Sequence, residues 1–155
     1  MDASDSSPKS QPGSVPEALS GVVQGLHHVA IAVRSLSDAE DFYAGALGFD
    51  MSAPEYVADQ GVNVVVAQAG GTRIEFVEPA DEKSPVARFL ENRGPGLHHL
   101  AWKVDSVAEA LHQLSARNVR LIDAVPRPGS HNTTIAFVHP SATGGVLMEL
   151  VQDPD

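Results

Sequence analysis

Two histidine pairs and two glutamates have the types and spacing that metal chemistry requires. The sequence Gly-Leu-His-His occurs at residues 25–28 and again at 96–99, and each copy runs into an alternating, strand-like segment. Glu75 lies 47 residues after His28, and Glu149 lies 50 residues after His99. Imidazole and carboxylate groups together bind Co, Ni, Mn, Zn or Fe(II) in proteins. The duplication therefore predicts a divalent metal site between two related halves of the chain, without selecting the metal.

Strand alternation indicates which histidine of each pair is a ligand. His28 and His99 share a strand face with small residues, whereas His27 and His98 fall on the other face and are assigned structural or exposed roles. Carboxylates are rarely buried without a partner. Two inward histidines and two inward glutamates in matching positions explain one another if a cation lies between them.

The segments between these residues repeat one order of elements. Each half reads as a strand with histidine, a helix behind a capping box, and further strands ending in the glutamate strand. The expected strands are 28–33, 62–69, 72–78, 99–104, 120–125, 133–138 and 146–151, with capping boxes at Ser37–Glu40 and Ser106–Glu109. The fold class is α+β, with two tandem βαβββ modules whose sheets pack side by side. Their shared concave surface would carry both histidines and both glutamates.

These modules define one domain behind a tail. Residues 1–24 are rich in Ser, Pro, Asp and Ala, lack the features of a signal or transit peptide, and are interpreted as a flexible tail. Residues 25–152 form a single domain, with module 1 at about 25–79 and module 2 at about 96–152. A linker helix at 80–95 opens at Ser84-Pro85 and ends before Gly94-Pro95-Gly96.

Composition narrows the functional classes. At 155 residues and 43% apolar content, the chain is long enough for one domain with a real core. Its net charge of −10 argues against nucleic-acid binding. The absence of cysteine leaves His, Asp and Glu as metal ligands. No apolar run reaches the length of a membrane span, so we expect a soluble, cytoplasmic protein with no membrane partner.

The remaining histidines carry weaker signals. His112 on the second helix and His139 before Pro140 look like ordinary surface and turn residues. His131 follows Gly129 and Ser130 in a polar loop, where a binding role and an ordinary loop role are equally balanced.

The motifs resemble those of the methylmalonyl-CoA epimerases, a family of the vicinal oxygen chelate superfamily that also includes glyoxalase I, extradiol dioxygenases and antibiotic-resistance proteins. The resemblance covers about residues 25–152. It rests on HHVAIAV at 27–33, Phe42-Tyr43, Gln60-Gly61-Val62, Glu78-Pro79, SPVARFL at 84–90, GLHHLAW at 96–102, FVHP at 137–140 and GGVLMEL at 144–150. It implies a glyoxalase-like fold, in which the two modules form a half-open mixed barrel.

The resemblance also implies a ligand set and a reaction. The metal ligands fall on His28, Glu75, His99 and Glu149, and the substrate is an acyl-CoA. The implied activity interconverts (R)- and (S)-methylmalonyl-CoA by removing the α-proton and forming a chelated enolate. Glu149 is the first choice of base for one face and Glu75 for the other. Some bacterial members carry a catalytic glutamate at the position that is Val64 here, so this chain departs from them.

Other implied features concern substrate contacts and assembly. Gly129, Ser130 and His131 would hydrogen-bond the substrate carboxylate. Lys103 is placed among the substrate-binding residues, and Arg73 and Arg127 are further candidate cations for the CoA phosphates; for each of the three, a solvated surface charge is the alternative interpretation. The family suggests a homodimer.

Three alternatives share the fold. A glyoxalase I-like lactoylglutathione lyase uses the same ligand types, although the segment after Ser84 and the GGVLMEL ending favour the epimerases. An extradiol dioxygenase uses two His and one Glu and is usually longer. A metal-free binding or resistance protein generally loses the ligand residues, whereas this chain keeps all four.

Overall fold

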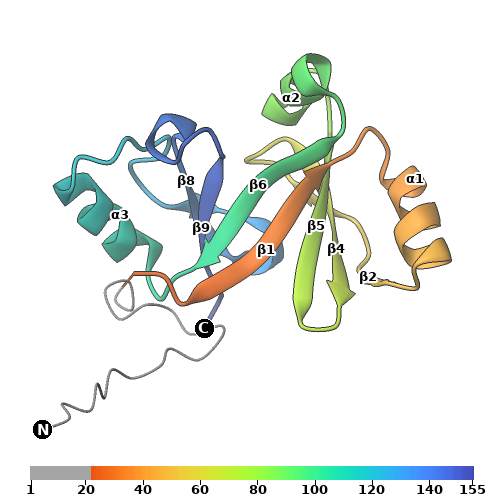
Figure 1. The fold of residues 1–155 in the computed structure, drawn as a ribbon, viewed down its shortest axis with the longest axis horizontal. Helices are drawn as coiled ribbons and strands as arrows, with labels where there is room; N and C mark the ends of the chain where they lie inside the picture. Colours follow the sequence, from red (N-terminus) through yellow and green to blue (C-terminus); the bar gives the residue numbers. More distant parts are fainter. Residues whose placement is uncertain (1–21) are drawn as a thin grey trace, which may run out of the picture.

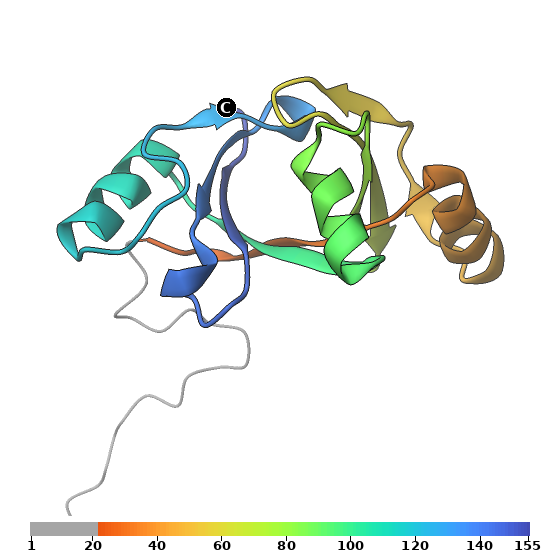
Figure 2. The same cartoon turned by 90° about the horizontal axis from the view of Figure 1, so that it is seen from above.

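The two Gly-Leu-His-His copies pair with each other at the centre of one sheet. A computed structural model describes residues 22–155, and in it β1 (Gly25–Ala32) runs antiparallel to β6 (Gly96–Lys103). The nine-stranded mixed sheet has the order β2-β4-β5-β1-β6-β9-β8-β7, with β3 paired to β4. It curves into a half-barrel with β1 and β6 at its base (Figures 1 and 2). The predicted α+β class and half-open mixed barrel are confirmed.

Each module places a parallel strand beside its histidine strand. In module 1, β5 (Thr72–Pro79) runs parallel to β1 and antiparallel to β4 (Val62–Ala69). The short strands β2 (Asp50–Met51) and β3 (Glu55–Val57) each pair antiparallel with β4. In module 2, β9 (Met148–Gln152) runs parallel to β6 and antiparallel to β8 (Thr134–Val138), which pairs with β7 (Arg127–Pro128). The strand that ends each module therefore returns to lie beside the strand that begins it.

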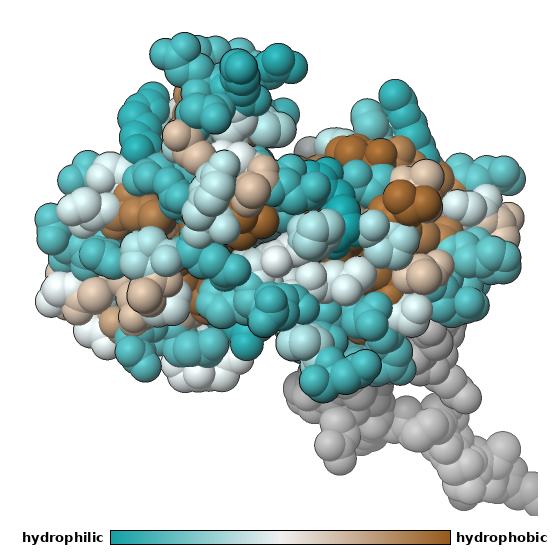
Figure 3. All heavy atoms as spheres, turned by 180° about the vertical axis from the view of Figure 1, so that it is seen from behind, coloured by the Kyte–Doolittle hydropathy of each residue, from teal (hydrophilic) through white to brown (hydrophobic). Residues whose placement is uncertain are grey.

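The helices cover both sides of the curved sheet. α1 (Leu36–Glu40) and α3 (Val107–Ala116) pack on its outer face, against apolar clusters that include Phe76 and Leu150. α2 (Pro85–Arg93) packs instead on the concave side of module 1 through Val86 and Leu90. Short turns η3 (Ser130–Asn132) and η4 (Pro140–Ala142) flank β8. The segment of β7 and η3 crosses the mouth of the half-barrel opposite β1 and β6 (Figure 2). The surface seen from behind carries apolar patches among hydrophilic side chains (Figure 3).

The expected strand at residues 120–125 does not form. Leu121 makes one isolated bridge to Val138, and the Asp123 carboxylate then accepts the Phe137 backbone N–H at 2.8 Å. Ile122 N and Asp123 N both donate to Phe137 O, at 3.0 and 3.2 Å, so the segment keeps backbone contacts with β8 without a regular ladder. The Asp123 side chain takes the acceptor place for Phe137 N, and Pro126 has no N–H with which to continue a ladder.

The first helix begins and continues differently from its sequence pattern. Its N-cap is Ser35, whose hydroxyl accepts from Asp38 N, rather than Ser37. Beyond α1 the chain widens into the π-helix η2 (Asp41–Ala46), where Phe42 is 54% exposed while Tyr43 still packs against Phe76. In the second helix, Ser106 caps Glu109 N as predicted.

Residues 1–21 of the predicted tail lie outside the described residues. The last part of that tail contacts the domain, because Val22 packs beside the α3 cluster and Gln24 N donates to Lys103 O at 2.8 Å. No helix in residues 22–155 is long and apolar enough to cross a membrane.

Gly129, in the loop before β8, lies where a larger residue has no room. A Cβ on Gly129 would lie 2.6 Å from Thr133 Oγ1 and 2.7 Å from Ile135 Cγ2. We expect Gly129→Ala to lower the free energy of unfolding in urea by about 1–3 kcal/mol, because the packed loop must shift. Gly71→Ala is the matched control, since an added Cβ there meets no atom within 4 Å. Equal effects of the two substitutions would contradict this role for Gly129.

Candidate metal centre

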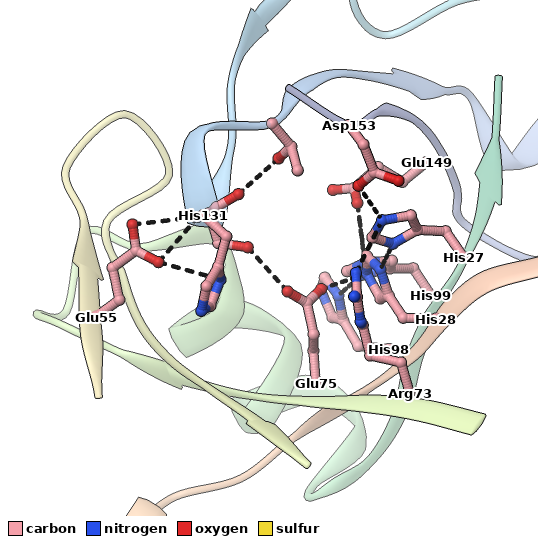
Figure 4. Close-up of polar contacts among 12 residues, drawn as sticks. His27, His28, Glu55, Arg73, Glu75, His98, His99, His131, Glu149 and Asp153 are labelled. Carbon is pink, nitrogen blue, oxygen red and sulfur yellow. Dashed lines mark hydrogen bonds and ion pairs between the residues drawn. The ribbon is translucent and has the colours of Figure 1, made fainter. Parts of the chain in front are cut away.

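The four predicted ligands meet on the concave face. His28, Glu75, His99 and Glu149 are each at most 6% exposed, and one donor atom from each lies within 4.8 Å of the others. The Nε2 atoms of His28 and His99 are 3.3 Å apart. Glu149 Oε1 lies 3.4 Å from His28 Nε2 and 3.8 Å from His99 Nε2, and Glu75 Oε2 contacts His28 Nε2 (Figure 4).

Sheet register brings these four side chains together around two alanines. Ala30 on β1 is paired with Glu75 on one side and His99 on the other. Ala101 on β6 is paired with His28 and Glu149. Both alanines are fully buried, and their short side chains leave the space that the longer ones fill. The matching pattern is the pseudo-twofold relation that the sequence repeat predicted.

Two β-bulges turn the first histidine of each pair toward the same site. The β1–β6 register slips between Leu26 and His28, which leaves His27 unpaired, and slips again where β6 skips His98. A bulge breaks strict alternation and re-aims side chains. Strict alternation would place His27 and His98 on the opposite face from the ligands, and the bulges bring these two histidines beside the ligands instead.

The bulged histidines contact the second ring nitrogen of each ligand. His27 Nδ1 lies 2.7 Å from His28 Nδ1, and His98 Nδ1 lies 2.8 Å from His99 Nδ1. Metal-ligating histidines almost always donate their other N–H to a neighbouring acceptor, which leaves one lone pair for the metal. The repeated histidine doublet was the available signal for this arrangement, since a single ligand needs only one histidine in each copy.

Polar contacts and burial set the protonation of the site. Burial by itself would raise the pKa of Glu75, but hydrogen bonds from His28 and from Ser130, at 2.9 Å, together with the nearby imidazoles, lower it to about 2. Burial and the neighbouring His99 lower the pKa of His98 to about 4. Burial also lowers the pKa of His27. The site thus combines an ionised Glu75 carboxylate with two neighbouring histidines, His27 and His98, whose burial favours the neutral imidazole.

The predicted substrate-binding residues lie in two places. Gly129 and Ser130 line the small space around the four ligands, and His131 faces the neighbouring cavity. His131 has φ 54° and contacts Glu55 through both its backbone N–H, at 2.9 Å, and Nδ1, at 3.2 Å. Lys103 lies apart from the ligands, with Nζ 3.5 Å from Asp153 Oδ2.

The two arginines also have protein partners. Arg73 Nη1 lies 3.0 Å from His27 Nε2. Arg127 binds Asp59 at 2.7 Å and Asp123 at 3.2 Å; burial alone would lower its pKa, but these carboxylates raise it. Arg127 therefore ties the loop of module 2 to module 1.

Cavities open around the four ligands. One of about 550 Å³ is lined by Glu75, Ser130, His131 and Arg73. A second of about 380 Å³ is lined by His98, Phe137 and residues 58–62. A third of about 890 Å³ runs past His98 and His99 along α2 and residues 145–147. A ligand of extended shape therefore has access to the centre from more than one direction.

The residues fit a bound divalent cation. Two carboxylates this deeply buried are costly without compensating charge. The side chains that contact them are those of His28, His99 and Ser130, and no lysine or arginine among residues 22–155 is paired with Glu75 or Glu149. Two Nε2 atoms and two carboxylates at this spacing form a nitrogen and oxygen donor set for a first-row divalent ion.

Comparisons with known proteins agree with this architecture. Residues 27–137 match the Glyoxalase/Bleomycin resistance protein/Dioxygenase superfamily. The mitochondrial methylmalonyl-CoA epimerase of Dictyostelium discoideum is 40% identical over 126 residues, which span 81% of this chain and 76% of that protein.

Solved structures extend the similarity to the fold. The methylmalonyl-CoA epimerase of Mycobacterium tuberculosis is 38% identical with a TM-score of 0.82, covering 86% of this chain and 90% of that one. A methylmalonyl-CoA epimerase in complex with methylmalonyl-CoA and NH4+ is 30% identical with a TM-score of 0.78, covering 83% and 93%. The chain therefore belongs to the glyoxalase/bleomycin resistance protein/dioxygenase superfamily and, within it, to the methylmalonyl-CoA epimerase family.

The half-buried His98 gives the fold a pH dependence. Its folded-state pKa of about 4 lies below the ordinary value of 6.5, so the unfolded chain binds more protons between these values. With chelator present, the free energy of unfolding should fall as the pH drops from about 6.5 to about 4, and His98→Gln should flatten this slope.

The slope can be measured by urea denaturation at several pH values. His112→Gln is the control, because it removes an imidazole from the exposed side of α3. An unchanged slope in His98→Gln would show that His98 does not carry the effect.

Proposed function

We propose that the protein interconverts the (R) and (S) forms of methylmalonyl-CoA through removal and return of the α-proton. The observation that carries the proposal is the buried set of two histidines and two glutamates, in a chain of the methylmalonyl-CoA epimerase family. The structural relative with bound methylmalonyl-CoA supports an acyl-CoA as the ligand.

The site supplies the groups that the reaction needs. A divalent cation held by the four side chains would supply Lewis acidity to the carbonyl oxygens, which acidifies the α-proton. Glu149 accepts this proton while the C–H electron pair moves into the thioester carbonyl. A proton returned to the opposite face of the planar carbon completes the inversion.

The contacts of the two glutamates favour Glu149 as the first base. Its oxygen lies 3.4 Å and 3.8 Å from the imidazole nitrogens, beyond ordinary hydrogen-bond length. Glu75 accepts from Ser130 through one carboxylate oxygen and contacts His28 through the other, so both of its oxygens already have protein partners. Glu75 is thus well suited to be a ligand, and it is also the remaining buried carboxylate for the second face.

Val64 supports this division of roles. Its side chain is 4% exposed in an apolar cluster with Val57 and Val77, and it lines the space around the ligands. No proton can be exchanged at that position. The two glutamates must therefore supply both faces between them.

The cavities suggest how the rest of the substrate is held. The 890 Å³ cavity is lined by Arg88 and Arg93 of α2 and reaches His98 and His99, so it offers cations beside the centre. The polar loop at Ser130 and His131 faces the other side and remains our proposal for the substrate carboxylate. We also predict a homodimeric state and a cytoplasmic location, and the donor set is compatible with Co, Ni, Mn, Zn or Fe(II).

Deuterium exchange tests the proposal. Protein prepared with each candidate metal is incubated with (R)- or (S)-methylmalonyl-CoA in deuterium oxide, and exchange at the α-carbon is followed by mass spectrometry. We expect metal-dependent exchange that Glu149→Gln lowers by about 10²–10⁴-fold, because a proton-transfer group is lost. Glu91→Gln, on the exposed side of α2, should leave the rate unchanged. Absence of metal-dependent exchange, or activity only on a glutathione hemithioacetal, would overturn the proposal.

Glu75→Gln distinguishes a base from a ligand. If Glu75 serves the second face, the variant should exchange the α-proton of one enantiomer and fail to invert it, because only one face keeps its base. Chiral analysis of the product measures inversion separately from exchange. Equal loss of exchange for both enantiomers would show that Glu75 acts only as a ligand.

A further inference from the structure

His27 connects the candidate metal centre to two groups of opposite charge. Its Nδ1 faces His28, while its Nε2 lies 2.8 Å from Asp153 Oδ1 and 3.0 Å from Arg73 Nη1 (Figure 4). The His27 side chain is 6% exposed, whereas that of Asp153 is 39% exposed. An imidazole nitrogen either donates or accepts, so Nε2 of a neutral His27 cannot satisfy both neighbours at once.

In one arrangement of protons, a series of hydrogen bonds runs from His28 through His27 and ends on Asp153. His28 Nδ1–H donates to His27 Nδ1, and His27 Nε2–H donates to the Asp153 carboxylate. His28 Nε2 then carries a lone pair and can bind a cation. Arg73 finds no acceptor on His27 in this arrangement.

In the other arrangement, the series of hydrogen bonds begins on Arg73. Arg73 donates to His27 Nε2, His27 Nδ1–H donates to His28 Nδ1, and His28 Nε2–H donates to Glu75 Oε2, which it contacts. His28 then has no lone pair for a cation. Each imidazole holds one proton in both arrangements, so conversion moves protons within the rings and leaves the net charge unchanged.

We propose that Asp153 selects the cation-binding tautomer of His28 through His27, and that Arg73 favours the opposing tautomer. Asp153 and His27 are positioning residues, because they act on the metal through His28. This inference rests on the metal centre of the proposed function but not on its reaction.

The second module lacks this control. His98 contacts His99 at 2.8 Å and packs edge-on against the Phe89 ring. Among residues 22–155, no charged side chain pairs with His98 in the way that Asp153 pairs with His27, and His98 instead borders cavities. The repeated ligand set is therefore symmetric, while the groups behind its two histidines are not.

Placement of Asp153 depends on the end of β9. Gln152 Oε1 accepts from Val107 N at 3.0 Å at the start of α3, which fixes the chain just before Asp153. Lys103 Nζ lies 3.5 Å from the other carboxylate oxygen. Asp153 is thereby held with one oxygen toward His27.

Zinc affinity and histidine tautomers test the proposal without substrate. Zn²⁺ affinity is measured by competition with a chromophoric chelator, and long-range ¹H–¹⁵N spectra report which nitrogen of His28 carries the proton, with His27→Gln used for assignment. Asp153→Ala should weaken Zn²⁺ binding by about 10–100-fold and increase the Nε2–H tautomer of His28 in chelated protein. Asp153→Asn keeps an acceptor and should recover part of the affinity.

Controls separate the proposal from a general charge effect. Asp155→Ala removes an exposed carboxylate two residues away and should bind Zn²⁺ as the unaltered protein does. Arg73→Met should bind at least as tightly as the unaltered protein. Unchanged affinity and tautomer in Asp153→Ala, or weaker Zn²⁺ binding in Arg73→Met, would overturn the proposal. Both readouts stand whether or not the protein exchanges an α-proton.

Discussion

Two buried carboxylates beside two buried imidazoles impose the constraint on which the site depends. Four donor atoms within 4.8 Å, each on a side chain that is at most 6% exposed, require a positive charge among them. The sheet meets this demand by pairing the two histidine strands directly and placing each glutamate strand in parallel beside them. Two buried alanines keep the space open. The core packing leaves cavities beside this centre, while η3 covers the ligands through the hydrogen bond of Ser130 to Glu75.

The duplication gives the site its symmetry, and the reaction makes use of it. An epimerase must remove a proton from one face of a planar carbon and return it to the other. Pseudo-twofold modules place a glutamate on either side of the centre, which suits this requirement. The two carboxylates nevertheless have different surroundings, since Ser130 holds Glu75 while Glu149 keeps longer contacts. A symmetric scaffold can thus assign different roles to equivalent residues.

The same contrast holds for the histidines behind the ligands. Bulges bring His27 and His98 to the second nitrogen of each ligand, yet only His27 continues to charged groups. The two histidine doublets therefore have different surroundings. His98 is half-buried beside the Phe89 ring, whereas His27 is connected to Asp153 and Arg73.

The residue pattern by itself determined most of the fold and the four proposed ligands. Periodicity predicted β1, β4, β5 and β6, and the repeat implied that the histidine strands meet at a shared surface, because duplicated modules bury their faces against each other. It failed at residues 120–125, where the Asp123 carboxylate replaces a backbone partner, and at η2, a wider helical turn in which Phe42 is exposed. Neither the hydrogen bond of Asp123 nor the wider turn of η2 alters the periodicity of the sequence, so the pattern did not reveal them.

Only the tertiary structure decided what surrounds the ligands. Alternation placed His27 and His98 on the wrong face, because a bulge depends on the register of two strands distant in sequence. Arg73 on β5 and Asp153 just after β9 reach His27 from 46 and 126 residues away along the chain, and no local pattern predicts their meeting. The sequence thus determined which residues can bind a metal, while the packing of its two halves decided which groups control their protons.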